Sequence, residues 1–144
     1  MTRATLSILA VVVGCAGSAA DVEPLGDYTT WKRIDTYGKT PGHGDSYRII
    51  YVNDIAETYV AGSPEGYPDG SIFVKQVHDR VGDQAGELRV IEIMRSTGQP
   101  LADDGGFIFT AASEVGGEET AKSFCWRRCH QAAPFQGAWF DYSR

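Results

Sequence analysis

Two cysteines and a histidine lie close together near the C-terminus of this 144-residue chain. They are Cys125, Cys129 and His130, in the spacing Cys-x-x-x-Cys-His. Attachment of a c-type haem requires two thiols that add to its vinyl groups, followed directly by an imidazole that ligates iron, and Cys-x-x-Cys-His is the usual form. The present spacing is one residue longer, and two cysteines four residues apart share a face if the segment is helical. This arrangement favours covalent haem attachment.

A disulfide and a zinc site are the alternatives for the same residues. An oxidising compartment would allow a bond between Cys125 and Cys129, but cysteines so close in sequence close a very small loop that stabilises a domain little. Zinc would need a fourth ligand beside two cysteines and one histidine, and none is obvious. The other histidines, His43 and His78, have no assigned role. The motif by itself leaves all three chemistries open, with haem favoured.

A lysine stands between apolar residues in a segment that is expected to be a strand. Alternation along residues 71–78 places Phe73, Lys75 and Val77 on one face. Such a lysine can guard an edge strand, or lay its stem along apolar surface while the amine reaches water. Burial would instead favour the neutral amine, a nucleophile that can form covalent bonds. The residue pattern alone favours the solvated lysine.

The first 20 residues have the pattern of an export signal. Arg3 is their only charge, residues 6–14 are apolar, and small residues follow. This order is typical of a secretory signal peptide. We therefore expect a periplasmic or otherwise exported protein, with a lipid anchor on Cys15 as the alternative form of processing. Residues 21–144 would then form the mature domain.

The composition fits a single packed domain that does not bind nucleic acid. Hydrophobic residues make up 42% of the chain and charged residues 22%, which is enough apolar material for a core. The formal net charge is −6. Domains that neutralise phosphates are usually basic, so this charge argues against a nucleic-acid partner.

Strands dominate the predicted elements. Turn-forming residues predict a tight turn at 67–70, and Asn53 is a plausible N-cap of a short helix. Residues 116–131 are expected to be helix or turn. β-Branched and aromatic residues predict strands at 47–52, 71–78, 87–95 and 107–112. Because strands and helices do not alternate regularly, we expect an α+β fold: a mainly antiparallel sheet with a few packed helices and a C-terminal haem-binding segment.

Three blocks of sequence, in a fixed order, carry a resemblance to a known family. They are Tyr-Arg-Ile-Ile-Tyr-Val-Asn-Asp at 47–54, Tyr-Pro-Asp-Gly-Ser-Ile-Phe-Val-Lys at 67–75, and the cysteine–histidine motif after Phe124. Together, behind an export signal, they resemble the cytochrome P460 family, which also contains the cytochromes c′-β. The resemblance covers most of the expected mature chain and overturns the disulfide interpretation.

The resemblance implies a cofactor, a site and an activity. Family members are mainly antiparallel sheets with accessory helices, usually homodimers, that carry a c-type haem. Cys125 and Cys129 would hold the haem, and His130 would be the proximal iron ligand, which leaves the distal side open. Lys75 matches a strand lysine that P460 proteins bond to the porphyrin, and Arg48 matches an arginine near the distal pocket. Hydroxylamine oxidation, with electrons passed to a small soluble acceptor, and nitric oxide binding are the associated activities.

One departure from the family pattern bears on the reaction. Hydroxylamine-oxidising members place a carboxylate about one turn ahead of the haem motif, where this chain has Ala121. Glu118 or Glu119 would have to replace it as the base that takes up released protons. Phe107 and Phe109 would suit an apolar distal pocket for nitric oxide. An enzyme, a nitric-oxide-binding protein and a haem-free, disulfide-bonded domain therefore remain as three hypotheses.

Overall fold

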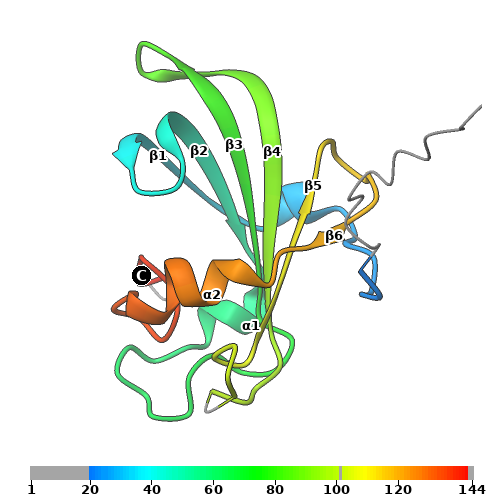
Figure 1. The fold of residues 1–144 in the computed structure, drawn as a ribbon, viewed down its shortest axis with the longest axis vertical. Helices are drawn as coiled ribbons and strands as arrows, with labels where there is room; N and C mark the ends of the chain where they lie inside the picture. The colour runs from blue at the N-terminus through cyan, green and yellow to red at the C-terminus, as the bar shows by residue number, and fades with distance from the viewer. Residues whose placement is uncertain (1–19, 101, 143–144) are drawn as a thin grey trace, which may run out of the picture.

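One six-stranded antiparallel sheet forms the centre of the computed structural model, which describes residues 20–100 and 102–142. Each strand pairs with its neighbours in sequence, as Figure 1 shows. The strands are β1 Lys32–Thr40, β2 Gly44–Val52, β3 Ile72–Val81, β4 Gln84–Ser96, β5 Phe107–Ala112 and β6 Thr120–Ala121. The predicted antiparallel sheet is confirmed. Cys15 and most of the expected export signal lie outside the described residues, so export stays a prediction.

The predicted strands appear in the structure, and one further strand precedes them. Residues 47–52 and 87–95 lie within β2 and β4, most of 71–78 lies in β3, and 107–112 coincides with β5. β1 has no counterpart among the predictions. Its side chains alternate between half-buried and exposed, and charged residues, threonines and a glycine fill most of its positions. Pairing with β2 along its whole length, rather than its own hydrophobicity, makes this segment a strand.

The helices of the described chain are short. The helical elements are α1 Asp54–Glu57, α2 Phe124–Arg128, and the single 3₁₀ turns η1 Tyr28–Thr30 and η2 His130–Ala132. Asn53 caps α1 as predicted, because its side-chain oxygen accepts a hydrogen bond from Ala56 N at 3.0 Å. None of the helices among the described residues is long and apolar enough to cross a membrane.

The segment expected to be helix or turn at 116–131 is helical only near its end. Gly116 has a left-handed φ of 72°, which a continuous helix does not allow. Thr120–Ala121 then pairs with β5, so the sheet satisfies backbone groups that a helix would have satisfied internally. The helix begins at Phe124 and carries the first cysteine of the motif.

The sheet buries both faces under different covers. On one face, Tyr28 and Trp31 of the N-terminal segment pack on the strands. The other face, called here the helix-covered face, lies under α1, α2 and the C-terminal segment (Figure 1). Its buried core comprises Ile50, Val52, Ala56, Tyr59, Tyr67, Phe73, Met94, Phe107, Phe109, Ala138 and Tyr142. Full burial of one large apolar side chain is worth about 1.5–3 kcal/mol, so this core holds the C-terminal segment on the sheet.

Strand register places two charged residues in the middle of the helix-covered face. Lys75 pairs with Glu92 on the neighbouring strand. The next row toward α1 is apolar, because Met94 pairs with Phe73 on one side and Phe109 on the other. Alternation along β3 thus puts Lys75 on the same face as Phe73, as the sequence predicts.

Candidate functional site

The two cysteines lie on and just after α2. Cys125 is in the helix, and Cys129 follows its last residue and donates a backbone hydrogen bond to the Cys125 carbonyl at 3.2 Å. Both are free, half-buried thiols. Burial raises the pKa of the Cys125 thiol, and the nearby Glu92 carboxylate raises it further. The Cys125 side chain packs against the core of the helix-covered face, so the segment holds its first thiol toward the sheet.

The imidazole of His130 is held in the way that suits a metal ligand. Its Nδ1 lies 2.6 Å from the carbonyl oxygen of Gly137, and the Phe109 ring packs beside it with centroids 4.8 Å apart. Burial lowers the pKa of His130, although the Gly137 hydrogen bond opposes this shift. A neutral imidazole whose Nδ1–H donates to a backbone carbonyl presents Nε2 as a free ligand.

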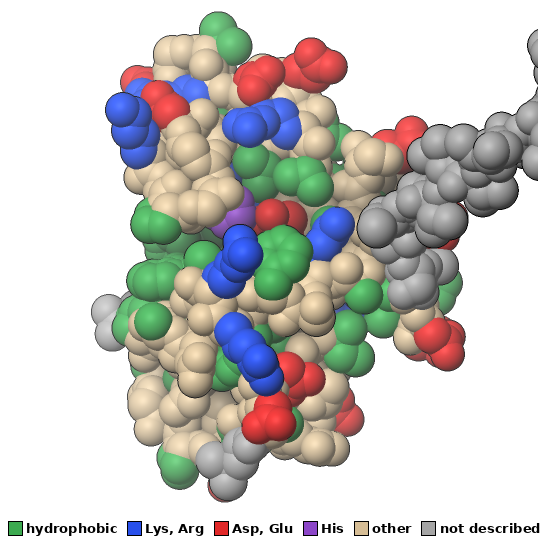
Figure 2. Space-filling view, in the orientation of Figure 1, with side chains coloured by type: hydrophobic (Ala, Val, Ile, Leu, Met, Phe, Trp, Pro, Cys, Tyr) green, Lys and Arg blue, Asp and Glu red, His purple; other side chains and the backbone are tan. Residues whose placement is uncertain are grey.

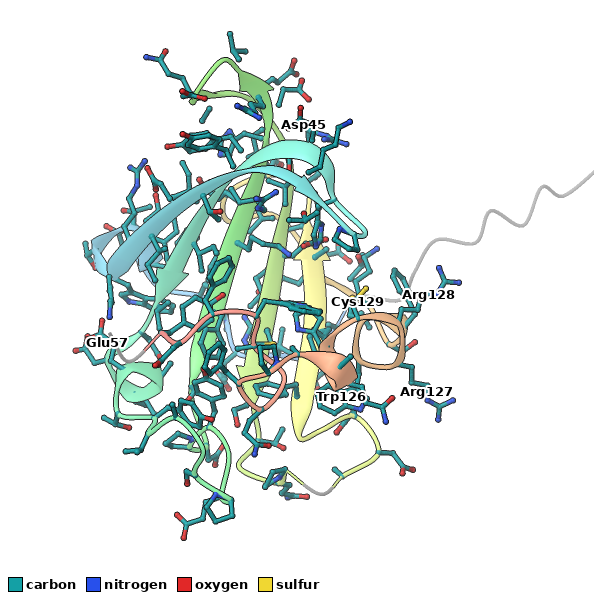
Figure 3. All side chains as sticks on the ribbon, turned by 90° about the vertical axis from the view of Figure 1, so that its left-hand side faces the viewer. Asp45, Glu57, Trp126, Arg127, Arg128 and Cys129 are labelled. Atoms are coloured by element: carbon teal, nitrogen blue, oxygen red, sulfur yellow. The ribbon has the colours of Figure 1, made fainter. Side chains whose placement is uncertain are left out.

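Trp126 anchors α2 to the sheet. Its ring packs near Phe107, with centroids 6.3 Å apart. It also lies so close to Gly105 that a Cβ at that position would be 2.1 Å from the indole. Arg127 and Arg128, by contrast, are exposed and point away from the sheet in Figure 3. One residue of the spacer between the cysteines therefore fixes the segment, while the others face solvent.

A lysine, a carboxylate and a second histidine meet on the helix-covered face. Lys75 Nζ lies 2.6 Å from Glu92 Oε2 and 2.9 Å from His43 Nε2. His43 comes from the turn between β1 and β2, and its Nδ1 lies 3.6 Å from Glu92 Oε2. The Lys75 and Glu92 side chains are 20% and 32% exposed, so a small ligand can reach them.

This cluster and the cysteine–histidine motif belong to one site. The turn that carries His43 reaches the motif, since a Cβ on Gly42 would lie 3.9 Å from Cys129 Sγ. The charges of Lys75 and Glu92 also act on the pKa of both Cys125 and His130, beside the larger effect of burial. Figure 2 shows histidine, acidic and basic side chains gathered near the middle of the visible face. The structure therefore brings the predicted haem-attachment residues and Lys75 together.

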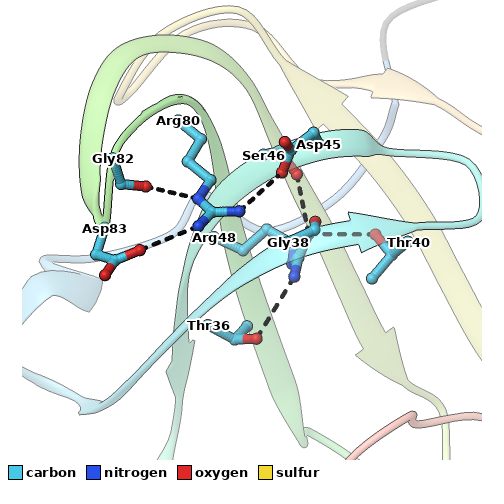
Figure 4. Close-up of polar contacts among 9 residues, drawn as sticks. All are labelled: Thr36, Gly38, Thr40, Asp45, Ser46, Arg48, Arg80, Gly82 and Asp83. Atoms are coloured by element: carbon cyan, nitrogen blue, oxygen red, sulfur yellow. Dashed lines mark hydrogen bonds and ion pairs between the residues drawn. The ribbon is translucent and has the colours of Figure 1, made fainter.

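Arg48 lies on the same face but is held by the β1–β2 hairpin (Figure 4). Burial lowers the pKa of this guanidinium. Its partners are all neutral oxygens, and Arg80 ties the tips of the two neighbouring hairpins together nearby. Arg48 donates to Ser46 Oγ at 2.9 Å, Gly38 O at 3.0 Å, Thr40 Oγ1 at 3.2 Å and Thr36 Oγ1 at 3.4 Å. The predicted distal arginine thus lies at the edge of the site, with its donors engaged.

The structure does not bring Glu118 or Glu119 to Lys75. Glu119 accepts hydrogen bonds from Arg95 NH1 and NH2 at 2.7 and 2.8 Å. Arg95 alternates with Met94 along β4, so this pair lies on the face opposite the site. Glu118 is exposed in the loop before β6. The β6 pairing thus holds Glu119 against Arg95 and away from Lys75, and the role of base predicted for Glu118 or Glu119 stays a prediction.

Phe107 and Phe109 are buried on the helix-covered face, as an apolar pocket requires. Their contacts, however, place them beside Trp126 and His130 respectively. Phe109 therefore lies next to the expected iron ligand, and the distal role predicted for the two rings stays a prediction.

Glu92 and His43 are the site residues that the sequence did not single out. Glu92 carried a usable signal, since it alternates in phase with Val90 and Met94 and puts a charge at a position expected to be apolar. His43 carried none, because its turn is rich in glycine and polar residues and gives no sign of which strand it covers.

Two free thiols and a histidine whose Nε2 is free to bind a metal, on one face of an antiparallel sheet, are the donor set of a c-type cytochrome. The family model for cytochrome P460 matches residues 25–140, and the chain belongs to that family. No curated protein matches the chain. Family membership implies haem binding and a cytochrome of the c type. Among the described residues, no group of three or more His, Cys, Asp or Glu side chains is placed to hold a metal ion.

Proposed function

We propose that this chain is an exported mono-haem cytochrome of the P460 type, which binds small nitrogen oxides at an open distal haem position and oxidises hydroxylamine. The observation that carries the proposal is the Lys75–Glu92 pair, 2.6 Å apart, on the face against which Cys125 packs and where His130 contacts the buried Phe109. It puts an amine and a carboxylate base beside a haem-attachment motif. The proposal includes a soluble electron acceptor and a homodimer.

The residues present fit a covalently attached haem. Cys125 and Cys129 have free thiols that would form the thioether bonds. His130 would ligate iron through Nε2, since Gly137 O engages its Nδ1. When bound, the haem would supply an open coordination position and accept electrons. Lys75 is the residue that the family resemblance would bond to the ring.

Glu92 is the residue to which we assign proton uptake. Hydroxylamine oxidation releases protons, and a base within hydrogen-bonding reach accelerates such a step. The Glu92 side chain is 32% exposed, so its carboxylate is accessible, and Lys75 holds it in place. Glu92 thus takes the role that the sequence assigned to Glu118 or Glu119.

A nitric-oxide-binding protein without turnover is the second candidate, and Arg48 is the observation that favours it. Its N–H groups donate to backbone and hydroxyl oxygens of the hairpin and not toward Lys75. An arginine held in this way is less available to bind and orient hydroxylamine for oxidation, whereas nitric oxide is a weak hydrogen-bond acceptor and gains little from such a donor.

Haem content and turnover of the full chain, matured in a bacterial periplasm, test the proposal. We expect the intact mass to include one covalent haem and the protein to oxidise hydroxylamine with a soluble acceptor. Glu92→Gln should lower the rate about 100-fold, while Glu118→Gln, an exposed carboxylate elsewhere, should leave it unchanged. A haem-loaded protein that binds nitric oxide without turnover would establish the second candidate, and a haem-free protein would overturn both.

A further inference from the structure

His43 is brought over the helix-covered face by a tight turn. Gly42 and Gly44, on either side of it, have left-handed φ angles of 81° and 64° that other residues rarely adopt. The turn also approaches the haem-attachment segment, since a Cβ on Gly42 would lie 3.9 Å from Cys129 Sγ. The turn thus reaches from the second cysteine of the motif to Lys75.

The hydrogen-bond partners of His43 indicate which of its two ring nitrogens carries the proton. A lysine ammonium can only donate, so the His43 Nε2 that lies 2.9 Å from Lys75 Nζ must be the unprotonated acceptor. The ring proton is then on Nδ1, the nitrogen that faces Glu92 at 3.6 Å. Glu92 therefore orients the ring from one side, and the free lone pair points at Lys75.

The surrounding charges keep this lone pair available. Burial lowers the pKa of His43, and the charge of Lys75 lowers it further, against the opposing effect of Glu92. Arg48 and His130, the other titratable groups that act on the ring, also lower it. These effects favour the neutral ring, whose Nε2 lone pair then faces Lys75 at 2.9 Å.

We propose that His43 accepts the proton that Lys75 must lose before its amine can bond to haem. The inference rests on the proposed function, and it assigns a role to a histidine outside the haem-attachment motif. The neutral Lys75 amine forms an N–C bond to a ring carbon, and nitrogen and carbon each lose one hydrogen. Hydrogen peroxide would be the oxidant: the two electrons and two protons released would convert one molecule of it into two molecules of water. Glu92 lies closer to Lys75, but its carboxylate also faces His43 Nδ1 at 3.6 Å and so stabilises the imidazolium that forms when His43 takes the proton.

The rate of cross-linking in haem-loaded full-length protein tests this role without measuring turnover. After peroxide addition and proteolysis, the link appears as a branched peptide in which haem joins the Lys75 peptide to the Cys125–Cys129 peptide. The variant is His43→Gln, which keeps a hydrogen-bonding side chain but cannot take up the proton. The matched control is His78→Gln, because the His78 nitrogens face Gly86 O at 3.0 Å and Gln76 Oε1 at 3.3 Å instead.

We expect His43→Gln to form the branched peptide about 100-fold more slowly than wild type at pH 7, and His78→Gln to match wild type. Equal rates for His43→Gln and wild type at pH 7, in proteins with the same haem spectrum, would overturn the proposal. Haem attachment without a branched peptide in wild type would refute the lysine link and this role of His43. A protein that attaches no haem would refute the proposed function itself.

Discussion

Removing the carboxylate of Glu119 should destabilise the fold and leave the candidate site intact. Glu119 accepts hydrogen bonds from Arg95 at 2.7 and 2.8 Å and another from the Thr110 hydroxyl. The side chains of Arg95 and Glu119 are only 10% and 11% exposed. In Glu119→Ala, the guanidinium would stay buried without its counter-charge. Breaking a buried pair in this way costs about 3–5 kcal/mol of unfolding free energy.

Urea unfolding of the haem-loaded protein, followed by far-ultraviolet circular dichroism, measures this loss. Glu118→Ala is the matched control, because Glu118 is the residue next to Glu119 in sequence and its side chain is exposed. Its unfolding free energy should stay within about 0.5 kcal/mol of wild type. Both variants should keep the wild-type haem spectrum and hydroxylamine turnover, since neither carboxylate lies near Lys75.

Two outcomes would contradict this reasoning. Equal unfolding free energies for Glu118→Ala and Glu119→Ala would show that the Arg95 pair does not stabilise the fold as its burial implies. A Glu119→Ala variant that kept its stability but lost turnover would restore Glu119 as the catalytic base, and would reject its placement on the opposite face.

Three further perturbations have defined outcomes. Gly105→Ala should lower the unfolding free energy by about 1–3 kcal/mol in thermal unfolding, because its Cβ would overlap the Trp126 ring, whereas Gly26→Ala, with no atom within 4 Å, should change little. Acid should weaken the fold through Glu119. Burial raises the pKa of this carboxyl, but hydrogen bonds from Arg95 and Thr110 lower it more, so its pKa lies below the ordinary value. This stabilisation is complete above the unfolded-state pKa of about 4.3 and is lost as the pH falls through the lower pKa of the folded state. Between about pH 7 and 3, the unfolding free energy of wild type should therefore fall more than that of Glu119→Ala. Lys75→Ala should keep its thioether-bound haem but lose the red-displaced band of the reduced spectrum, and an unchanged band would reject the lysine link.

Features that depend on residues close together in sequence could be predicted, whereas contacts that depend on strand register could not. β5 coincides with its predicted bounds because its apolar residues follow directly on the glycine pair that ends at Gly106. The cysteine–histidine motif is equally local. His43 lies 32 residues from Lys75 in sequence and meets it only because β1 and β2 fold back as a hairpin beside β3. Glu92 faces Lys75 only in the observed register, which a shift of one residue would abolish.

Two ion pairs on opposite faces of the sheet differ in how exposed they are, and this difference bears on their roles. The Arg95–Glu119 pair is about one-tenth exposed, and its carboxylate also accepts from Thr110. It is a closed network, which is the form in which a buried charge stabilises a fold. The Lys75–Glu92 pair is more exposed, and Lys75 also contacts His43 at 2.9 Å. Water screens the more exposed pair, which therefore stabilises the fold less, so the place of Lys75 beside the haem-attachment motif is better explained by the proton transfer proposed for the three groups.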